Sequence, residues 1–191
     1  MKLLLLIAAL SPAALAQVRV EQRLLVKDGH LFVSAGGTWL ERNDYYSSPG
    51  VVLSAVYYPR ENDGLELRTA LFASSMSGSA GEVLAATGLK PDAQRPVALL
   101  LAGWRHSLAY GKIAVGSGVV HFDVQSGLHL GTLITDVSAT PALSASAGVV
   151  ARLGTRGFAQ LDLALLVSRE QRTSAVLALG ALPLLTFGFS L

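Results

Sequence analysis

The stretch that decides the fold is residues 119–133, which reads VVHFDVQSGLHLGTL. Successive side chains of a β-strand point to opposite faces, so alternation with a period of two predicts a strand with two different faces. One face is apolar and carries Val120, Phe122, Val124, Leu128 and Leu130, whereas the other is polar or small and carries His121, Asp123, Gln125, Gly127, His129 and Gly131.

The same alternation recurs along the chain. Leu65 and Leu67 alternate with Glu66 and Arg68, and leucines flank Asp162 in the same way. Eight such segments predict strands at residues 30–39, 50–58, 64–73, 97–106, 119–133, 143–153, 157–168 and 175–191.

The composition indicates whether the apolar face contacts lipid or a protein core. Of 191 residues, 51% are hydrophobic and 15% charged, against about a quarter charged in a typical soluble chain. A soluble sandwich needs a polar solvent face, yet residues 97–106, 143–153 and 175–191 carry almost no charge on either face. This favours strands with apolar residues toward lipid and polar residues inward. A soluble, lipocalin-like periplasmic barrel remains the alternative.

Strands can cross lipid only as a closed barrel, because open edges leave backbone groups unsatisfied. Bacterial barrels have an even strand count, of which eight is the smallest. We therefore predict an all-β fold, an eight-stranded antiparallel up-and-down transmembrane β-barrel over residues 30–191, preceded by a lead-in at residues 17–29. Side chains fill the interior of so small a barrel.

The predicted inward faces carry ionisable residues of both signs. Buried charges must be paired, so we expect a polar network in the lumen with a structural role. Its predicted members are Glu66, Arg68, Arg105, His121, Asp123, His129, Arg152 and Asp162.

The N-terminus has the pattern of a secretory signal peptide. Lys2 precedes a short apolar run, and Ala14, Leu15 and Ala16 form an A-x-A cleavage site, which predicts a leader at residues 1–16. An uncleaved anchor is the alternative. The chain has no cysteine, which excludes a lipid anchor on cysteine, disulfides and thiolate metal sites. We expect export to the outer membrane of a Gram-negative bacterium. The 15 basic and 13 acidic residues are scattered, so nucleic-acid binding has no support.

Connections and aromatic residues refine this prediction. Residues 40–49 and 74–96 are expected to be long connections, the second with a short helix at residues 80–87. Pro183 lies within the last predicted strand and should mark a bulge or strand start, because it cannot donate to the ladder. Residues at predicted strand ends, which can form girdles at the membrane interface, are Trp39, Tyr45, Tyr46, Tyr57, Tyr58 and Trp104.

Catalytic and metal chemistry has weak support. Ser107 and His106 resemble a nucleophile and its base. They are adjacent, however, and adjacent strand residues point to opposite faces. His121, Asp123 and His129 share a face and are candidate metal ligands, but hydrogen bonding inside a lumen explains them better. We therefore predict no catalytic residue, no metal and no cofactor.

The segment from Trp104 to Lys112, followed by residues 120–123 (VHFD), resembles an outer-membrane β-barrel domain family described mainly from myxobacteria. Members carry a W-S-P-x-Y-G-K-like turn before a strand with V-x-F-D. The family's proline is absent here, which predicts a looser turn at residues 104–112. Further similarity lies at Leu31, residues 43–44, residues 57–58 and residues 64–67, so the resemblance spans most of residues 23–191.

The resemblance implies an eight-stranded outer-membrane barrel. Some relatives are associated with gliding-motility machinery, and the family has no established catalytic residues to carry over. We expect a structural or anchoring barrel of the cell envelope whose partners are outer-membrane lipid, the assembly machinery and an envelope protein complex. A small porin, an apolar-solute channel and a lipid-modifying hydrolase are the alternatives.

Overall fold

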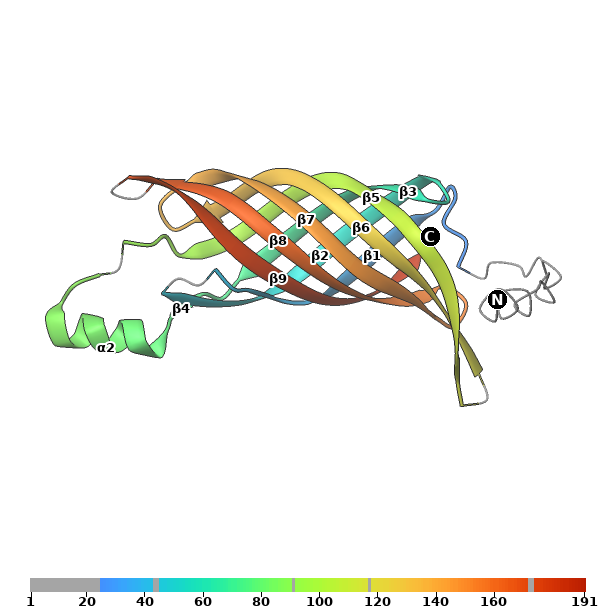
Figure 1. Ribbon diagram of the computed structural model, residues 1–191, viewed down its shortest axis with the longest axis horizontal. Helices are drawn as coiled ribbons and strands as arrows, with labels where there is room; N and C mark the ends of the chain where they lie inside the picture. The colour runs from blue at the N-terminus through green and yellow to red at the C-terminus, as the bar shows by residue number, and fades with distance from the viewer. Residues whose placement is uncertain (1–24, 43–44, 91, 117, 172–173) are drawn as a thin grey trace, which may run out of the picture.

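The computed structural model describes residues 25–42, 45–90, 92–116, 118–171 and 174–191 (Figure 1). The predicted signal peptide and residues 17–24 of the predicted lead-in lie outside the described residues. Among the described residues, no helix has the length and apolar character needed to cross a membrane.

In the part of the chain that the structure describes, eight long strands form one closed antiparallel sheet. Each strand pairs with its neighbour in the chain, and β1 pairs with β9 to complete the ring. The predicted all-β, eight-stranded antiparallel up-and-down barrel is confirmed. The strands are β1 (Leu31–Leu40), β2 (Tyr46–Arg60), β3 (Asp63–Phe72), β5 (Pro96–Val115), β6 (Gly118–Thr135), β7 (Ala139–Leu153), β8 (Gly157–Gln171) and β9 (Ala175–Ser190).

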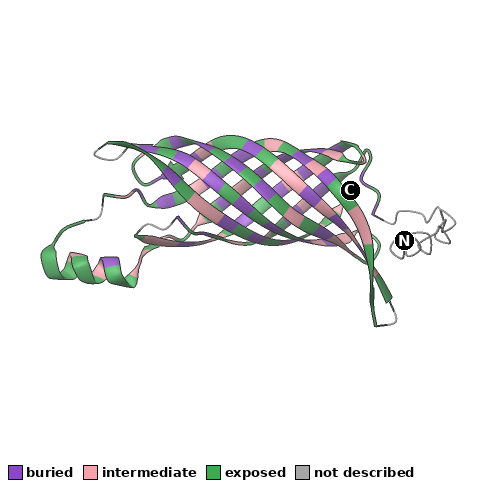
Figure 2. Cartoon of the chain, in the orientation of Figure 1, coloured by how far each residue is buried: buried purple, intermediate pink, exposed green. Residues whose placement is uncertain are grey.

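Buried and exposed residues alternate along every barrel strand, which gives the wall its chequered pattern in Figure 2. Asp162 and Ala164 are buried while Leu161 and Leu163 are exposed, as the alternation predicts. The faces predicted for residues 119–133 are confirmed in the same way, because His121, Asp123 and His129 are buried and Leu128 and Leu130 exposed.

The two ends of the barrel differ. Both described chain ends lie at one end, called here the termini end, together with the short β2–β3 and β7–β8 turns (Figure 1). The opposite loop end carries the β3–β5 connection, which contains β4 (Ser75–Met76) and α2 (Gly78–Thr87). The predicted helix is confirmed and begins two residues earlier than expected. The connection at residues 40–49 is shorter than predicted, because β2 begins at Tyr46 and pairs with β4.

Pro183 corrects a local prediction. It lies in mid-strand opposite Leu163, in an unbroken β8–β9 register, and not at a bulge or strand start. On its other side the β1–β9 ladder stops at Thr38 and Leu184 and resumes at the bridge between Glu41 and Ala181. The missing N–H therefore falls where the ladder is interrupted, which is how a sheet accommodates proline.

The predicted turn at residues 104–112 is wrong, because all of these residues belong to β5. β5 continues through these residues to Val115, and β6 starts at Gly118, so the turn begins at Gly116. A register shift between Ser107 and Ala109 places an extra residue in β5, a β-bulge. Beyond it the pairing of β5 with β6 continues as a projecting ribbon.

Candidate functional site

The centre of the lumen holds two arginines and two carboxylates. Arg68 donates from Nε to Glu66 and from Nη2 to Asp162, both at 2.9 Å. Arg105 donates from Nε to Glu66 at 2.9 Å and from Nη2 to Asp162 at 2.5 Å. The four side chains are at most 1% exposed. Because each arginine contacts both carboxylates, the buried charges are balanced, as burial away from water requires.

This quartet comes from three strands whose inward positions converge. Glu66 and Arg68 are two residues apart on β3, Arg105 is on the neighbouring β5, and Asp162 is on β8. β8 lies across the ring from β3, so the closed barrel alone brings Asp162 to the arginines. Nε2 of His129 on β6 adds a hydrogen bond to Glu66 at 2.9 Å. We call these five residues, Glu66, Arg68, Arg105, His129 and Asp162, the ionic layer.

Two inward glycines make room for the ionic layer. A Cβ on Gly103 would lie 2.6 Å from Cδ2 of His129, and a Cβ on Gly148 would collide with the carboxylate of Asp162. A larger residue at either position would also clash with the backbone of the neighbouring strand, so it would have to shift His129 or Asp162. The glycines on the inner wall are therefore part of how the sequence accommodates the network.

Hydrogen bonds extend the network toward the termini end. Oε1 of Gln125 accepts from Arg105 at 3.0 Å and from the hydroxyl of Tyr58 at 3.1 Å. The amide of Gln125 donates to Asp123 at 2.8 Å. The side chain of Gln125 therefore links Asp123 to the ionic layer.

Asp123 also anchors the predicted lead-in. The buried ammonium of Lys27 forms an ion pair with Asp123, and Ser107 donates to the same carboxylate at 2.7 Å. Glu61, in the β2–β3 turn, accepts hydrogen bonds from the backbone N–H groups of Lys27 at 2.9 Å and Asp28 at 3.1 Å. The described part of the lead-in therefore packs into the termini end of the barrel.

Two of the eight predicted network residues lie apart from it. The ring of His121 hydrogen-bonds to the hydroxyl of Tyr110 within the β5–β6 ribbon. Arg152 is at the termini end, where it donates to the carbonyl oxygens of Gly154 at 2.8 Å and Thr155 at 2.6 Å. Arg152 is the next-to-last residue of β7. Its side chain therefore reaches the β7–β8 turn and not the central carboxylates.

Sequence reasoning missed several members. Tyr58, Gln125 and Ser107 have the inward parity of their strands, and a parity rule applied to neutral polar residues would have found them. Lys27 precedes the first strand, and no pattern in the sequence indicated that it would be buried.

Buried apolar clusters lie on both sides of the ionic layer, beside the polar contacts described above. Toward the termini lies a cluster that includes Phe32, Tyr58 and Phe158. Toward the loops lies a larger group that we call the apolar layer: Leu40, Val52, Ala70, Leu99, Leu101, Leu133, Ala142, Ala164, Leu166, Leu182 and Leu184. All are at most 4% exposed. Packed side chains therefore fill the lumen, as expected for eight strands.

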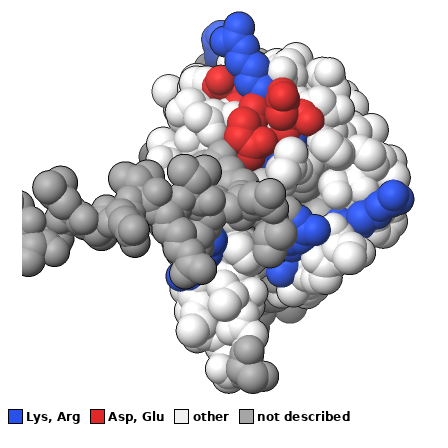
Figure 3. Space-filling view, turned by 90° about the vertical axis from the view of Figure 1, so that its right-hand side faces the viewer, with Lys and Arg blue, Asp and Glu red and all other residues white. Residues whose placement is uncertain are grey.

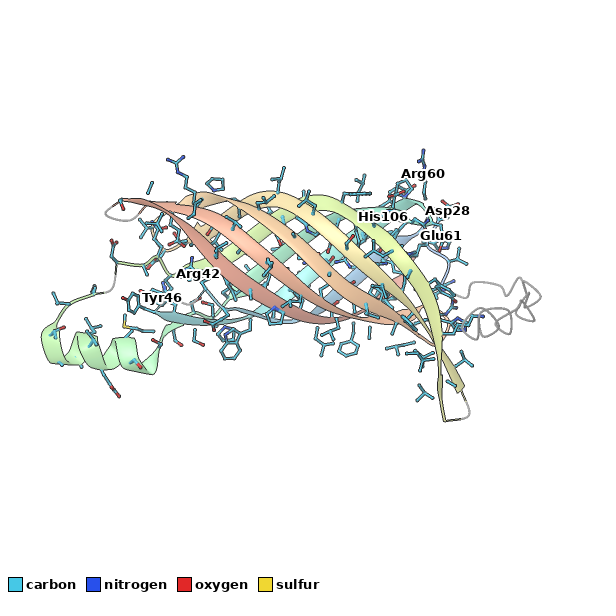
Figure 4. The ribbon with its side chains drawn as sticks, viewed as in Figure 1. Asp28, Arg42, Tyr46, Arg60, Glu61 and His106 are labelled. Carbon is cyan, nitrogen blue, oxygen red and sulfur yellow. The ribbon has the colours of Figure 1, made fainter. Side chains whose placement is uncertain are left out.

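A second polar group closes the loop end. Arg42 forms a buried ion pair with Glu170 and donates from Nη2 to the backbone oxygen of Gln94 at 2.6 Å. The side chain of Gln94 accepts from Thr135 at 2.9 Å and from Ser138 at 3.2 Å. These contacts tie three connections to the wall. Figure 4 shows Arg42 and Tyr46 at this end and Asp28, Arg60, Glu61 and His106 at the other.

An aromatic rim lies outside the wall at the termini end. Asp63, beside the β2–β3 turn, accepts a hydrogen bond from the indole of Trp104 at 3.1 Å and lies 2.9 Å from Nδ1 of His106. The indole and imidazole rings are 5.2 Å apart. This arrangement is typical of an interface where one side is apolar and the other wet.

The structure separates the residues that suggested hydrolysis. His106 lies on the outer face with Asp63, whereas Ser107 points inward to Asp123, which confirms the predicted opposite faces. Lys27 contacts Ser107 and is ion-paired with Asp123.

The suggested metal ligands are also apart. His121, Asp123 and His129 each bind a different partner, and the described residues contain no group of three His, Asp or Glu with the geometry of a metal site.

Comparisons with known proteins report on shape. No protein-family model matches the chain, and no curated protein matches it significantly. Among solved structures, a designed transmembrane β-barrel is 13% identical, with 90% of this chain and 99% of that chain covered and a TM-score of 0.45. Ail, the attachment invasion locus protein of Yersinia pestis, is 11% identical (coverage 86% and 99%, TM-score 0.44). The N-terminal β-barrel domain of Pseudomonas aeruginosa OprF is 14% identical (86% and 98%, 0.45).

Proposed function

We propose that this chain is an integral β-barrel of the bacterial outer membrane with a structural, anchoring role in the cell envelope. The observation that carries the proposal is the inversion of the barrel. Its charges are paired inside the lumen, whereas its outer wall exposes large apolar side chains. Leu65, Leu67, Leu161, Leu163 and Leu165 are each more than half exposed.

Such an exterior suits lipid. Monomeric soluble proteins rarely expose contiguous apolar patches larger than a few hundred Å². Here every barrel strand contributes outward apolar residues, so the exposed surface surrounds the wall (Figure 2). Contact with acyl chains removes that surface from water, and the closed ring leaves no sheet edge in the lipid.

The ends of the barrel support an orientation. Outer-membrane barrels combine short periplasmic turns with longer extracellular loops. The termini end, with its short β2–β3 and β7–β8 turns, is therefore assigned to the periplasm, and the loop end with α2 to the outside. Export through a cleaved leader at residues 1–16 is part of this proposal.

The filled lumen favours an anchor over a channel. Solute moving along the axis would have to displace both the ionic layer and the apolar layer. The role proposed is therefore not enzymatic and not that of a pore. The partners proposed are outer-membrane lipid, the assembly machinery and an envelope protein complex. A gliding-motility-like assembly rests on the resemblance to the myxobacterial family alone.

Fractionation and gel mobility test the placement. The protein should appear in the outer-membrane fraction, require detergent for extraction, and migrate differently on a gel before and after boiling. Recovery of mature protein in the soluble periplasm without detergent would overturn the membrane assignment.

Two further assays test the role. Planar bilayers containing the purified barrel should show no conductance steps. Conductance steps in these bilayers would contradict the anchoring role and favour a channel. Lipopolysaccharide mass should not change on overexpression, whereas a change would revive the hydrolase. Affinity purification from detergent-solubilised envelopes should recover envelope proteins.

A further inference from the structure

The β5–β6 hairpin outgrows its barrel. β3 pairs with β5 only as far as His106, opposite Asp63, and β7 pairs with β6 only as far as Phe122, opposite Ala151. Beyond these positions the two strands pair only with each other. We call residues 109–116 and 118–124 the ribbon. Its base still lies against β7, and its far part has no neighbouring strand among the described residues.

The ribbon turns away from the barrel. In Figure 1 it leaves the termini end and runs across the long axis, past the outline of the barrel. Figure 3, which looks onto that end, shows the ribbon extending below the barrel, and the described atoms of its far part are neither Lys or Arg nor Asp or Glu. Two local features explain the bend. The bulge at Ser107 and Ala109 increases twist, and Gly111 lets the ring of Phe122 lie directly against its backbone.

The register gives the ribbon two unlike faces. After the bulge, Tyr110 lies opposite Asp123 and Lys112 opposite His121, so these even-numbered β5 residues share the inward face of β6. The other face continues the outer wall of the barrel and contains no polar side chain. It is formed by Ala109, Gly111, Ile113, Val115, Gly118, Val120, Phe122 and Val124.

We propose that the ribbon lies in the periplasmic interface of the outer membrane, with this apolar face against the phospholipid leaflet. The face is continuous with the lipid-facing wall, and the bend carries the ribbon along the plane where the wall ends. Ile113 and Val115 are exposed in the barrel alone and would be covered by lipid. The inference rests on the proposed outer-membrane function.

The backbone fixes the depth. The unpaired edges of the ribbon carry N–H and C=O groups that hydrocarbon cannot satisfy but headgroups and interfacial water can. The ribbon therefore lies at headgroup level, where amphipathic segments bury their apolar face by about 5–10 Å.

The tip offers a matched pair for a test. Val115 and Val119 are 59% and 58% exposed, are close in the ribbon, and lie on opposite faces, since Val115 pairs with Gly118 and Val119 with Ala114. The chain has no cysteine, so Val115→Cys and Val119→Cys each give one labelling site.

The experiment places a fluorophore at each site in barrels refolded into phosphatidylethanolamine–phosphatidylglycerol vesicles and measures quenching by aqueous iodide. Leu163→Cys is the lipid reference, and Val137→Cys, exposed in the β6–β7 turn, is the water reference. Iodide should quench the label at Val115 several-fold less than the label at Val119. Ile113→Asp should abolish that difference, whereas Ala114→Asp, on the opposite face, should preserve it.

Equal, water-like quenching at Val115 and Val119 with Leu163 still protected would overturn the ribbon proposal and leave the membrane barrel standing. This is also the result expected if the ribbon instead pairs with a strand of another protein. Water-like quenching at Leu163 would refute the membrane barrel itself.

Discussion

The ionic layer and the apolar layer fill the same lumen in opposite ways. Both are built from inward positions of the same strands: Arg68 and Ala70 are neighbours of equal parity on β3, as are Asp162 and Ala164 on β8. One layer is stable because each charge has partners in fixed directions, and the other because apolar volume is filled. The outward-facing neighbours of the two layers are alike, because leucines flank both Asp162 and Ala164 on β8. The outer and inner faces of the barrel therefore obey separate constraints.

The largest effect should come from breaking the ionic layer. Asp162→Asn leaves two buried arginines with a single carboxylate, and removing one partner of a buried pair costs about 3–5 kcal/mol. Urea unfolding of the purified barrel in micelles measures the loss. Adding Arg68→Met restores the balance of charge and should recover part of the stability. If the double variant loses as much free energy of unfolding as the two single variants lose together, the charges act independently.

A cavity in the apolar layer comes next. Leu101 is fully buried, and Leu101→Ala should lower the free energy of unfolding by about 2–5 kcal/mol. Its neighbour Leu100 faces outward, so Leu100→Ala is the control and should cost less. Equal losses would mean that the apolar layer is loosely packed. The same urea titration compares both variants.

The outer face can be probed beside the ionic layer. Leu163→Arg should cost about 2–4 kcal/mol in vesicles if Leu163 is near the bilayer midplane. Leu177→Arg, near the loop-end start of β9, should cost about 0–1 kcal/mol because it is near the interface. Reversible unfolding from vesicles gives both values. An absence of depth dependence would count against lipid around the wall.

The smallest change tests the edge of the network. Tyr58→Phe removes one neutral hydrogen bond to Gln125, whose oxygen still accepts from Arg105, so the expected loss is about 0.5–1.5 kcal/mol. A loss as large as that of Asp162→Asn would extend the ionic layer to Tyr58. Urea midpoints of the two variants decide between these outcomes.

Much of the barrel could be predicted because strand parity is local. Alternation around Asp162 and around residues 119–133 fixed which side chains point inward, and the near absence of charge on the other face indicated lipid. Prediction failed where parity breaks or where contact is remote. The bulge at Ser107 and Ala109 shifts the parity of β5, so neither the true turn nor the ribbon followed from the Tyr110–Lys112 motif. Arg152 has inward parity but lies too near a turn to reach the carboxylates.

The sequence by itself determined the strands, their two faces and which charged residues point inward. All three follow from the alternation of side chains along each strand, which is a local property of the chain. Only the tertiary structure decided which charges pair. Asp162 meets Arg68 and Arg105 because the ring closes, and Lys27 reaches Asp123 because the segment before β1 folds into the mouth of the barrel. These pairings depend on the curvature and register of the whole sheet, which no local pattern encodes.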